Sequence, residues 1–161
     1  MGAIDVIGIE ARRVLIEALM SVAWADRTLT DEELSAARGA AVGLGLVMPG
    51  DEELTANDRQ PPAPEELMVD QLRERDRELI YLCAAWMALA DDEEAPDEVA
   101  VLDRLKERLD LDDERAGWLH DQAGILRQSS KETGASWWRA FDMVVVKAAK
   151  ALHIRATQGE D

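Results

Sequence analysis

The chain of 161 residues is poor in the residues that most often perform chemistry: it has one cysteine, two histidines, one tyrosine and one phenylalanine. A single cysteine cannot form a disulfide within the chain, and this usage is typical of a reducing compartment. Cys83 lies in an apolar helical stretch, where a thiol usually fills space in a core. His120 and His153 have no ligand-spaced partner, and the chain contains neither a glycine-rich phosphate loop nor a nucleophile elbow. We therefore expect a protein that is not an enzyme.

Long apolar runs are also absent. No stretch of about 18 apolar residues occurs, which is the least that a membrane-spanning helix needs. The first residues lack the basic region of a signal peptide. We expect a cytoplasmic protein without a transmembrane segment.

Basic residues are scarce relative to acidic ones: 18 Lys and Arg stand against 34 Asp and Glu, which gives a formal charge of −16. This charge repels a phosphate backbone, so nucleic acid is a poor partner. A cation or a basic protein surface would be attracted, although acidity that serves only solubility gives the same composition. The length and the 47% hydrophobic content suit one folded domain over residues 1–161.

Apolar residues recur at three- and four-residue intervals, and strand alternation is nearly absent. The pattern predicts an all-α fold, a compact bundle of about six to eight helices. Val99, Leu102 and Leu105 are expected to face the core. Three prolines near its end mark residues 47–64 as a linker. The expected helices cover about 9–25, 30–44, 65–72 (a brief one), 76–90, 96–109, 112–126 and 135–154, and the tail from 156 is expected to fray.

Two segments of the chain have similar residues at corresponding positions when Leu15 is aligned with Ile80, and no gap is needed. This alignment, which we call the repeat register, predicts an internal duplication of a helix–loop–helix unit, with repeat 1 at about 9–46, repeat 2 at about 74–111 and C-terminal helices over 112–155. Two such units would pack about a pseudo-twofold axis and bury each other's apolar faces. The further matched pairs include Ala25 with Ala90, Asp26 with Asp91, Glu33 with Glu98, and Leu44 with Leu109.

Each unit contains Ala-Asp at the end of its first helix and, after six further residues, Glu at the start of its second helix. The motifs are Ala25-Asp26 with Glu33 and Ala90-Asp91 with Glu98. Over roughly residues 9–126 the chain resembles the TerB-like family of tellurite-resistance proteins. The resemblance implies an all-helical fold, a role in metal or envelope stress-response assemblies, including peripheral association with a membrane complex, and a divalent-cation site at Asp26, Glu33, Asp91 and Glu98.

The acidic loops allow two interpretations. Four carboxylates brought together would need a neutralising cation, and oxygen ligands suit Ca²⁺, Mg²⁺ or Mn²⁺, with Zn²⁺ as a further candidate. Alternatively, the aspartates end one helix and the glutamates satisfy free backbone donors at the start of the next. Where the family usually has Gly after the loop Asp, this chain has Arg27 in one unit and Asp92 in the other.

Trp137 and Trp138 are adjacent in the last expected helix and cannot both face inward, so we expect one of them to be exposed. An exposed Trp here either contacts a partner or a membrane surface, or caps the edge of the core. The same helix carries Arg139, Lys147 and Lys150. Two functions are therefore considered. The first is a noncatalytic TerB-like interaction module of a stress-response system that binds a divalent cation. The second is a helical scaffold that binds a protein through Trp137 and Trp138 without metal. The sequence leaves the oligomeric state open.

Overall fold

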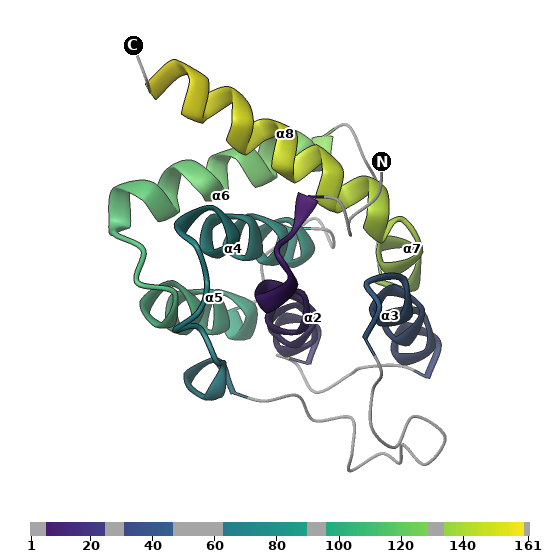
Figure 1. The fold of residues 1–161 in the computed structure, drawn as a ribbon. Helices are drawn as coiled ribbons and strands as arrows, with labels where there is room; N and C mark the ends of the chain where they lie inside the picture. Colours follow the sequence, from purple (N-terminus) through teal and green to yellow (C-terminus); the bar gives the residue numbers. More distant parts are fainter. Residues whose placement is uncertain (1–5, 25–30, 47–62, 90–95, 129–133, 160–161) are drawn as a thin grey trace.

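The computed structural model describes residues 6–24, 31–46, 63–89, 96–128 and 134–159, and these residues confirm the all-α prediction (Figure 1). No described residue belongs to a strand. The elements are α2 (Ile9–Ala23), α3 (Asp31–Gly43), the 3₁₀ turn η3 (Pro64–Glu66), α4 (Glu74–Leu89), α5 (Pro96–Arg108), α6 (Asp113–Gln128), α7 (Gly134–Arg139) and α8 (Phe141–Gly159).

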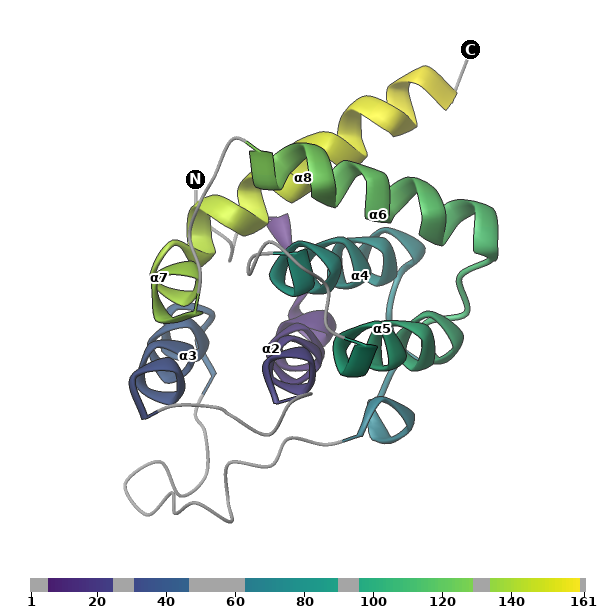
Figure 2. The ribbon, with the colours of Figure 1, turned by 180° about the vertical axis from the view of Figure 1, so that it is seen from behind.

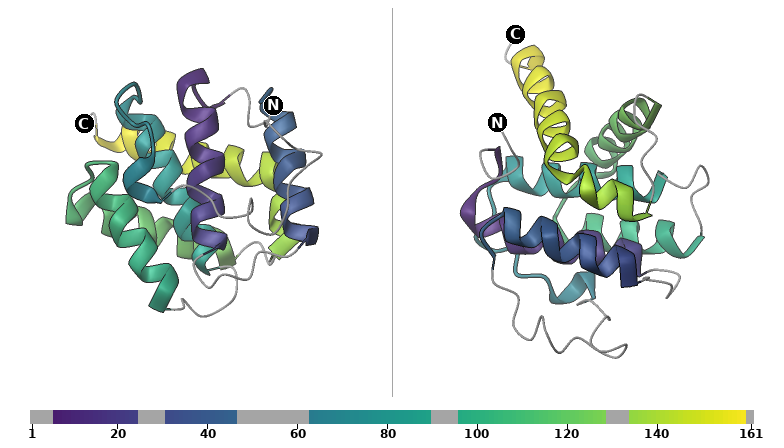
Figure 3. Two further views of the ribbon diagram at one scale, coloured as in Figure 1. Left: turned by 90° about the horizontal axis from the view of Figure 1, so that it is seen from below. Right: turned by 90° about the vertical axis from the view of Figure 1, so that its right-hand side faces the viewer.

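The helices pack in layers around α4. Helices α5, α2 and α3 lie side by side with α2 in the middle, and α4 packs against α2 and α5 (Figure 1). Helices α6 and α8 cover the opposite side of α4, as the view from behind also shows (Figure 2). The short α7 packs on α3, η3 packs on α5, and the last turns of α8 extend away from the other helices (Figure 3).

After its first turn helix α4 is buried on all sides, whereas the sequence predicted an amphipathic helix with one apolar face. Twelve of its sixteen residues are buried, Asp76 and Glu78 among them, and every residue from 78 to 88 is buried. Contacts with α2, α5, α6 and α8 explain this, because they leave that part of the helix no face for water. Asp76 accepts hydrogen bonds from Arg73 at 2.9 Å and from the Gly8 N–H at 3.3 Å, so its buried charge is compensated.

The segment before α4 differs from the brief helix expected over residues 65–72. Only η3 forms there, and residues 47–62 of the expected linker lie outside the described residues. Arginine side chains take the carbonyls that a helix would use for its backbone bonds. Arg77 donates to the Val69 oxygen at 3.0 Å and to the Leu72 oxygen at 3.4 Å, and Arg108 donates to the Leu67 oxygen at 2.9 Å.

Three further expectations about the helices were wrong. The last helix is broken at Ala140 into α7 and α8, because α7 packs on α3 whereas α8 crosses α4. Helix α8 continues to Gly159, beyond the expected end at residue 154. Val99 is 38% exposed, while Leu102 and Leu105 on the same helix are buried as expected.

Helices α3 and α5 have matching bounds and matching ends. Their residues, 31–43 and 96–108, correspond one to one in the repeat register. Each is followed by a residue with positive φ, Gly45 at 78° and Asp110 at 57°. The next N–H then bonds back to the helix, from Leu46 to the Ala41 oxygen at 3.0 Å and from Leu111 to the Lys106 oxygen at 3.1 Å. This is the Schellman arrangement, and it satisfies carbonyls at a helix end.

An arginine from the preceding long helix supports each of these ends. Arg12 of α2 donates to the Leu44 oxygen at 3.4 Å, and Arg77 of α4 donates to the Leu109 oxygen at 3.1 Å. The two donors correspond to each other in the repeat register, and so do the two acceptors. The same connection therefore joins α2 to the end of α3 and α4 to the end of α5.

Candidate functional site

The structure places two of the four acidic residues predicted as cation ligands. Glu33 is the third residue of α3, although its side chain lies outside the described part, and Glu98 is the third residue of α5 and is half-buried. Asp26 and Asp91 lie outside the described residues. The two glutamates thus occupy the same position in two helices with matching bounds, while the separation of the two aspartates is left untested.

Within the described ranges, no three His, Cys, Asp or Glu side chains form a group that could hold a metal ion. Because this statement does not include the side chains of Asp26, Glu33 and Asp91, it does not test the cation site. The site stays a prediction, and so does the alternative that these acids only cap helices.

The expectation that Trp137 or Trp138 is exposed was wrong. Their exposed fractions are 1% and 2%. Successive positions on a helix are about 100° apart, and α7 has neighbours in both directions because it contacts α3 and α8. The two indole rings pack edge to face with centroids 5.6 Å apart, and Trp138 stacks on Phe141 at 6.0 Å. This aromatic cluster fills the corner between the three helices.

Both indole N–H groups of this cluster are buried and have no acceptor among the described residues. A buried indole donor usually finds a hydrogen-bond partner. The cluster is therefore well packed but has two unsatisfied donors at one corner of the fold.

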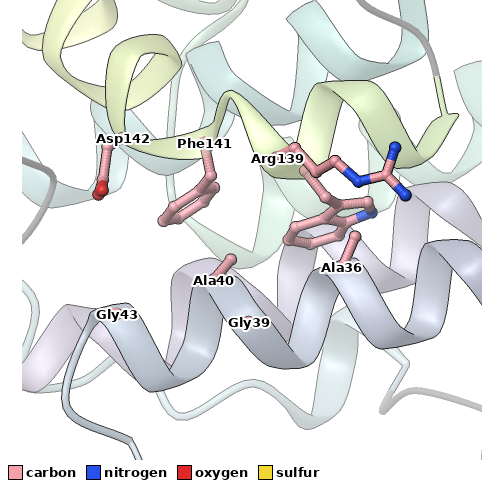
Figure 4. Close-up of a pocket in the computed structure, with 8 residues that line it drawn as sticks. Ala36, Gly39, Ala40, Gly43, Arg139, Phe141 and Asp142 are labelled. Atoms are coloured by element: carbon pink, nitrogen blue, oxygen red, sulfur yellow. The ribbon is translucent and has the colours of Figure 1, made fainter.

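A pocket of about 280 Å³ lies beside this cluster, between α3 and the junction of α7 with α8 (Figure 4). Arg139 and Asp142 lie toward opposite ends of the pocket, and the Phe141 ring points toward Ala40 (Figure 4). A methyl group on Gly39 or Gly43 would have no atom of a neighbouring element within 4 Å. The lining residues are Ala36, Gly39, Ala40, Gly43, Trp138, Arg139, Phe141 and Asp142.

Sequence reasoning missed this pocket, although a signal was present. Residues 36, 39, 40 and 43 are all Ala or Gly, and their spacing places them on one face of a helix. Taken alone, glycines in a helix indicate only close packing or fraying. Only the position of α7 and α8 shows that the small face borders an open space.

A second pocket, of about 380 Å³, lies between the start of α4 and the α5–α6 connection. Its arginines are already engaged by the protein itself. Arg77 donates to three backbone carbonyls, and Arg115 pairs with Glu78 and, at 3.6 Å, with Glu74. These contacts hold α4, α5 and α6 together, so this pocket is structural.

Cys83 is fully buried in α4, which confirms the prediction that it fills space in the core. Burial raises the pKa of its thiol to about 12, because desolvation disfavours the thiolate. A thiol in this state is a poor nucleophile and a poor metal ligand.

Comparison with protein-family models, with curated proteins and with solved structures gives no match. In the described part of the chain, no helix is both long enough and apolar enough to cross a membrane.

Proposed function

We propose that this protein is a noncatalytic TerB-like interaction module of a metal or envelope stress-response system, built from two equivalent helix–loop–helix units. The observation that carries this proposal is one register shared by helix bounds, helix ends and arginine contacts. Helices α3 and α5 have the same bounds in this register. The hydrogen bond from Arg12 to Leu44 corresponds to the one from Arg77 to Leu109. Periodicity alone would not give matching helix ends and matching tertiary hydrogen bonds.

The proposed duplication makes the two acidic loops equivalent. Residues 25–30 join α2 to α3, and residues 90–95 join α4 to α5. Asp26 and Asp91 occupy the same place in the two connections. We propose that these aspartates, with Glu33 and Glu98, bind a divalent cation such as Ca²⁺, Mg²⁺, Mn²⁺ or Zn²⁺. Helix pairs joined by the same contact at the end away from the loop would present the two loops in a related geometry.

Thermal unfolding of the chain with and without each cation tests this proposal. A ligand at about 100 times its Kd stabilises the folded state by roughly 2.7 kcal/mol. For a domain of this size that corresponds to a rise in Tm of roughly 5–11 °C. Asp26→Asn combined with Asp91→Asn is expected to abolish the rise.

The matched control is Asp70→Asn with Asp121→Asn, which removes the same charge at two exposed positions. This control variant is expected to keep the full rise in Tm. An unchanged Tm with every cation, or an equal loss of the rise in both double variants, would refute the cation site and leave the acids as helix caps.

The second candidate function, a scaffold that binds a protein partner near Trp137 and Trp138, is favoured by one observation. Trp138, which packs against Trp137, lines the pocket between α3 and the α7–α8 junction. A partner would contact this pocket, not an exposed indole.

A further inference from the structure

The pocket beside Trp138 continues along the small face of α3. Gly39 and Gly43 are exposed and have open space above their α-carbons. Val42, between them in sequence, is 64% exposed. Small residues at such spacing let a second helix backbone approach closely. We call this surface, formed by the pocket and the exposed side of α3 from Ala36 to Gly43, the α3 groove.

The pocket lies at the lower limit of the sizes that small-molecule sites have. Small-molecule sites usually have roughly 300–1,000 Å³, and this pocket has about 280 Å³. Its wall combines methyl groups of α3 with aromatic rings of α7 and α8 (Figure 4). One large apolar side chain can fill a space of this kind, as in helix-in-groove recognition.

Trp138 forms part of the aromatic wall of the pocket. It lines the pocket and is 2% exposed. Its indole N–H has no acceptor in the described part of the chain, and the same holds for Trp137, which does not line the pocket. The aromatic rings and the small residues of α3 therefore make this pocket suited to an apolar group.

The net charge of the chain indicates whether the α3 groove binds a second copy of this chain or another protein. Each copy carries −16, so two copies repel each other, whereas a basic segment is attracted. The start of α3 has this sign, whereas the two charged residues that line the pocket balance each other. Residues 31–33 at the start of α3 are all acidic, and Asp142 stands at one end of the pocket, with Arg139 at the other.

We propose that the α3 groove binds a basic amphipathic helix of a protein partner, with one large apolar side chain of that helix inserted in the pocket. The inference rests on the interaction role proposed above and is independent of the cation site. The partner helix packs over Gly39 and Gly43, and its basic residues face the acidic start of α3.

The test uses the full chain and a defined probe, a fluorescein-labelled peptide of about 18 residues made of Leu, Ala and Lys, with Leu at helical spacing. A second peptide carries Glu in place of every Lys. Fluorescence anisotropy at physiological ionic strength is expected to show binding of the Lys peptide only. Gly39→Leu with Gly43→Leu fills the groove and is expected to raise the Kd about tenfold or more.

Gly117→Leu is the matched control, because Gly117 is an exposed glycine of α6 whose added side chain also meets no neighbouring element. It is expected to leave the Kd unchanged. Equal Kd values for the groove variant and the control, no binding of the Lys peptide, or preferential binding of the Glu peptide would overturn the proposal. A far-ultraviolet circular dichroism melt verifies that each variant is folded.

Failure of this proposal and failure of the cation site are distinguishable. The groove variant is expected to keep any rise in Tm with divalent cations, because Gly39 and Gly43 are not among the predicted ligands. The Asp26→Asn and Asp91→Asn variant is expected to keep the binding of the Lys peptide. If removing those two aspartates abolished peptide binding while the groove variant did not, the loops would be the docking surface and the α3 groove would be rejected.

Discussion

Replacement of Arg77 by methionine should destabilise the fold strongly, because this side chain connects three segments of the backbone. Its guanidinium donates to the carbonyls of Val69 at 3.0 Å, Leu109 at 3.1 Å and Leu72 at 3.4 Å. A hydrogen bond that involves a charged group contributes about 1.5–3 kcal/mol. Because Arg77 is only partly buried, we use the low end of this range.

The two shorter bonds then contribute about 3 kcal/mol together, and the bond at 3.4 Å adds little. For a domain of this length the loss lowers Tm by roughly 6–12 °C. Methionine has a similar reach and no donor, so the substitution removes the hydrogen bonds and keeps much of the packing. Urea unfolding followed by circular dichroism measures the change in the free energy of unfolding.

Arg75→Met is the control, since Arg75 is an exposed residue of the same helix. A surface substitution of this type usually changes stability by less than about 0.5 kcal/mol. If Arg77→Met and Arg75→Met have the same free energy of unfolding within that margin, Arg77 does not hold the end of α5 and the segment before α4. Arg77→Lys is expected to be intermediate, because a single ammonium group cannot reach three carbonyls in the geometry of a guanidinium.

Two other residues give predictions from their pKa values. Burial raises the pKa of Glu17, with a smaller opposing effect of Arg13, so the folded protein binds a proton at this carboxyl more readily than the unfolded chain. Its contribution to stability therefore increases as the pH falls through the folded pKa, and Glu17→Gln should raise the free energy of unfolding at pH 7 and flatten its dependence on pH in urea titrations. Cys83, with a pKa of about 12, should react with a thiol reagent in native buffer only as fast as the protein opens, and at once in denaturant.

Each of these predictions can fail clearly. A lower free energy of unfolding for Glu17→Gln at pH 7 would mean that the ion pair with Arg13, at 4.0 Å, outweighs the cost of burying the carboxylate. Rapid labelling of Cys83 in native buffer, at a rate independent of added urea, would contradict its position in the centre of α4.

Several features of the fold could be predicted from the sequence because they depend on residue type and spacing along the chain. The starts of α2 and α5 were predicted at residues 9 and 96, where the helices begin, and the repeat register follows from comparing the chain with itself. The candidate cation ligands came from the resemblance to a known family, and only the positions of Glu33 and Glu98 in their helices are described. Local propensity and periodicity were sufficient for these features.

Other features depend on which elements meet in space. A single face was expected for α4, but helices on all sides bury it. Trp137 and Trp138 were expected to differ in exposure, but α3 and α8 cover both sides of α7. The segment before α4 was expected to be helical, but the Arg77 guanidinium takes carbonyls that a helix would have used. No pattern within one segment contains this information.

The sequence by itself determined that the chain is helical, acidic and similar to itself in the repeat register, because these properties are carried by residue type and spacing alone. Only the tertiary structure decided where the apolar faces are covered and where they are not. Ala36, Gly39, Ala40 and Gly43 are simply small in the sequence. They border a pocket because the bend at Ala140 places Trp138 and Phe141 on one side of α3 and leaves the space above the two glycines open.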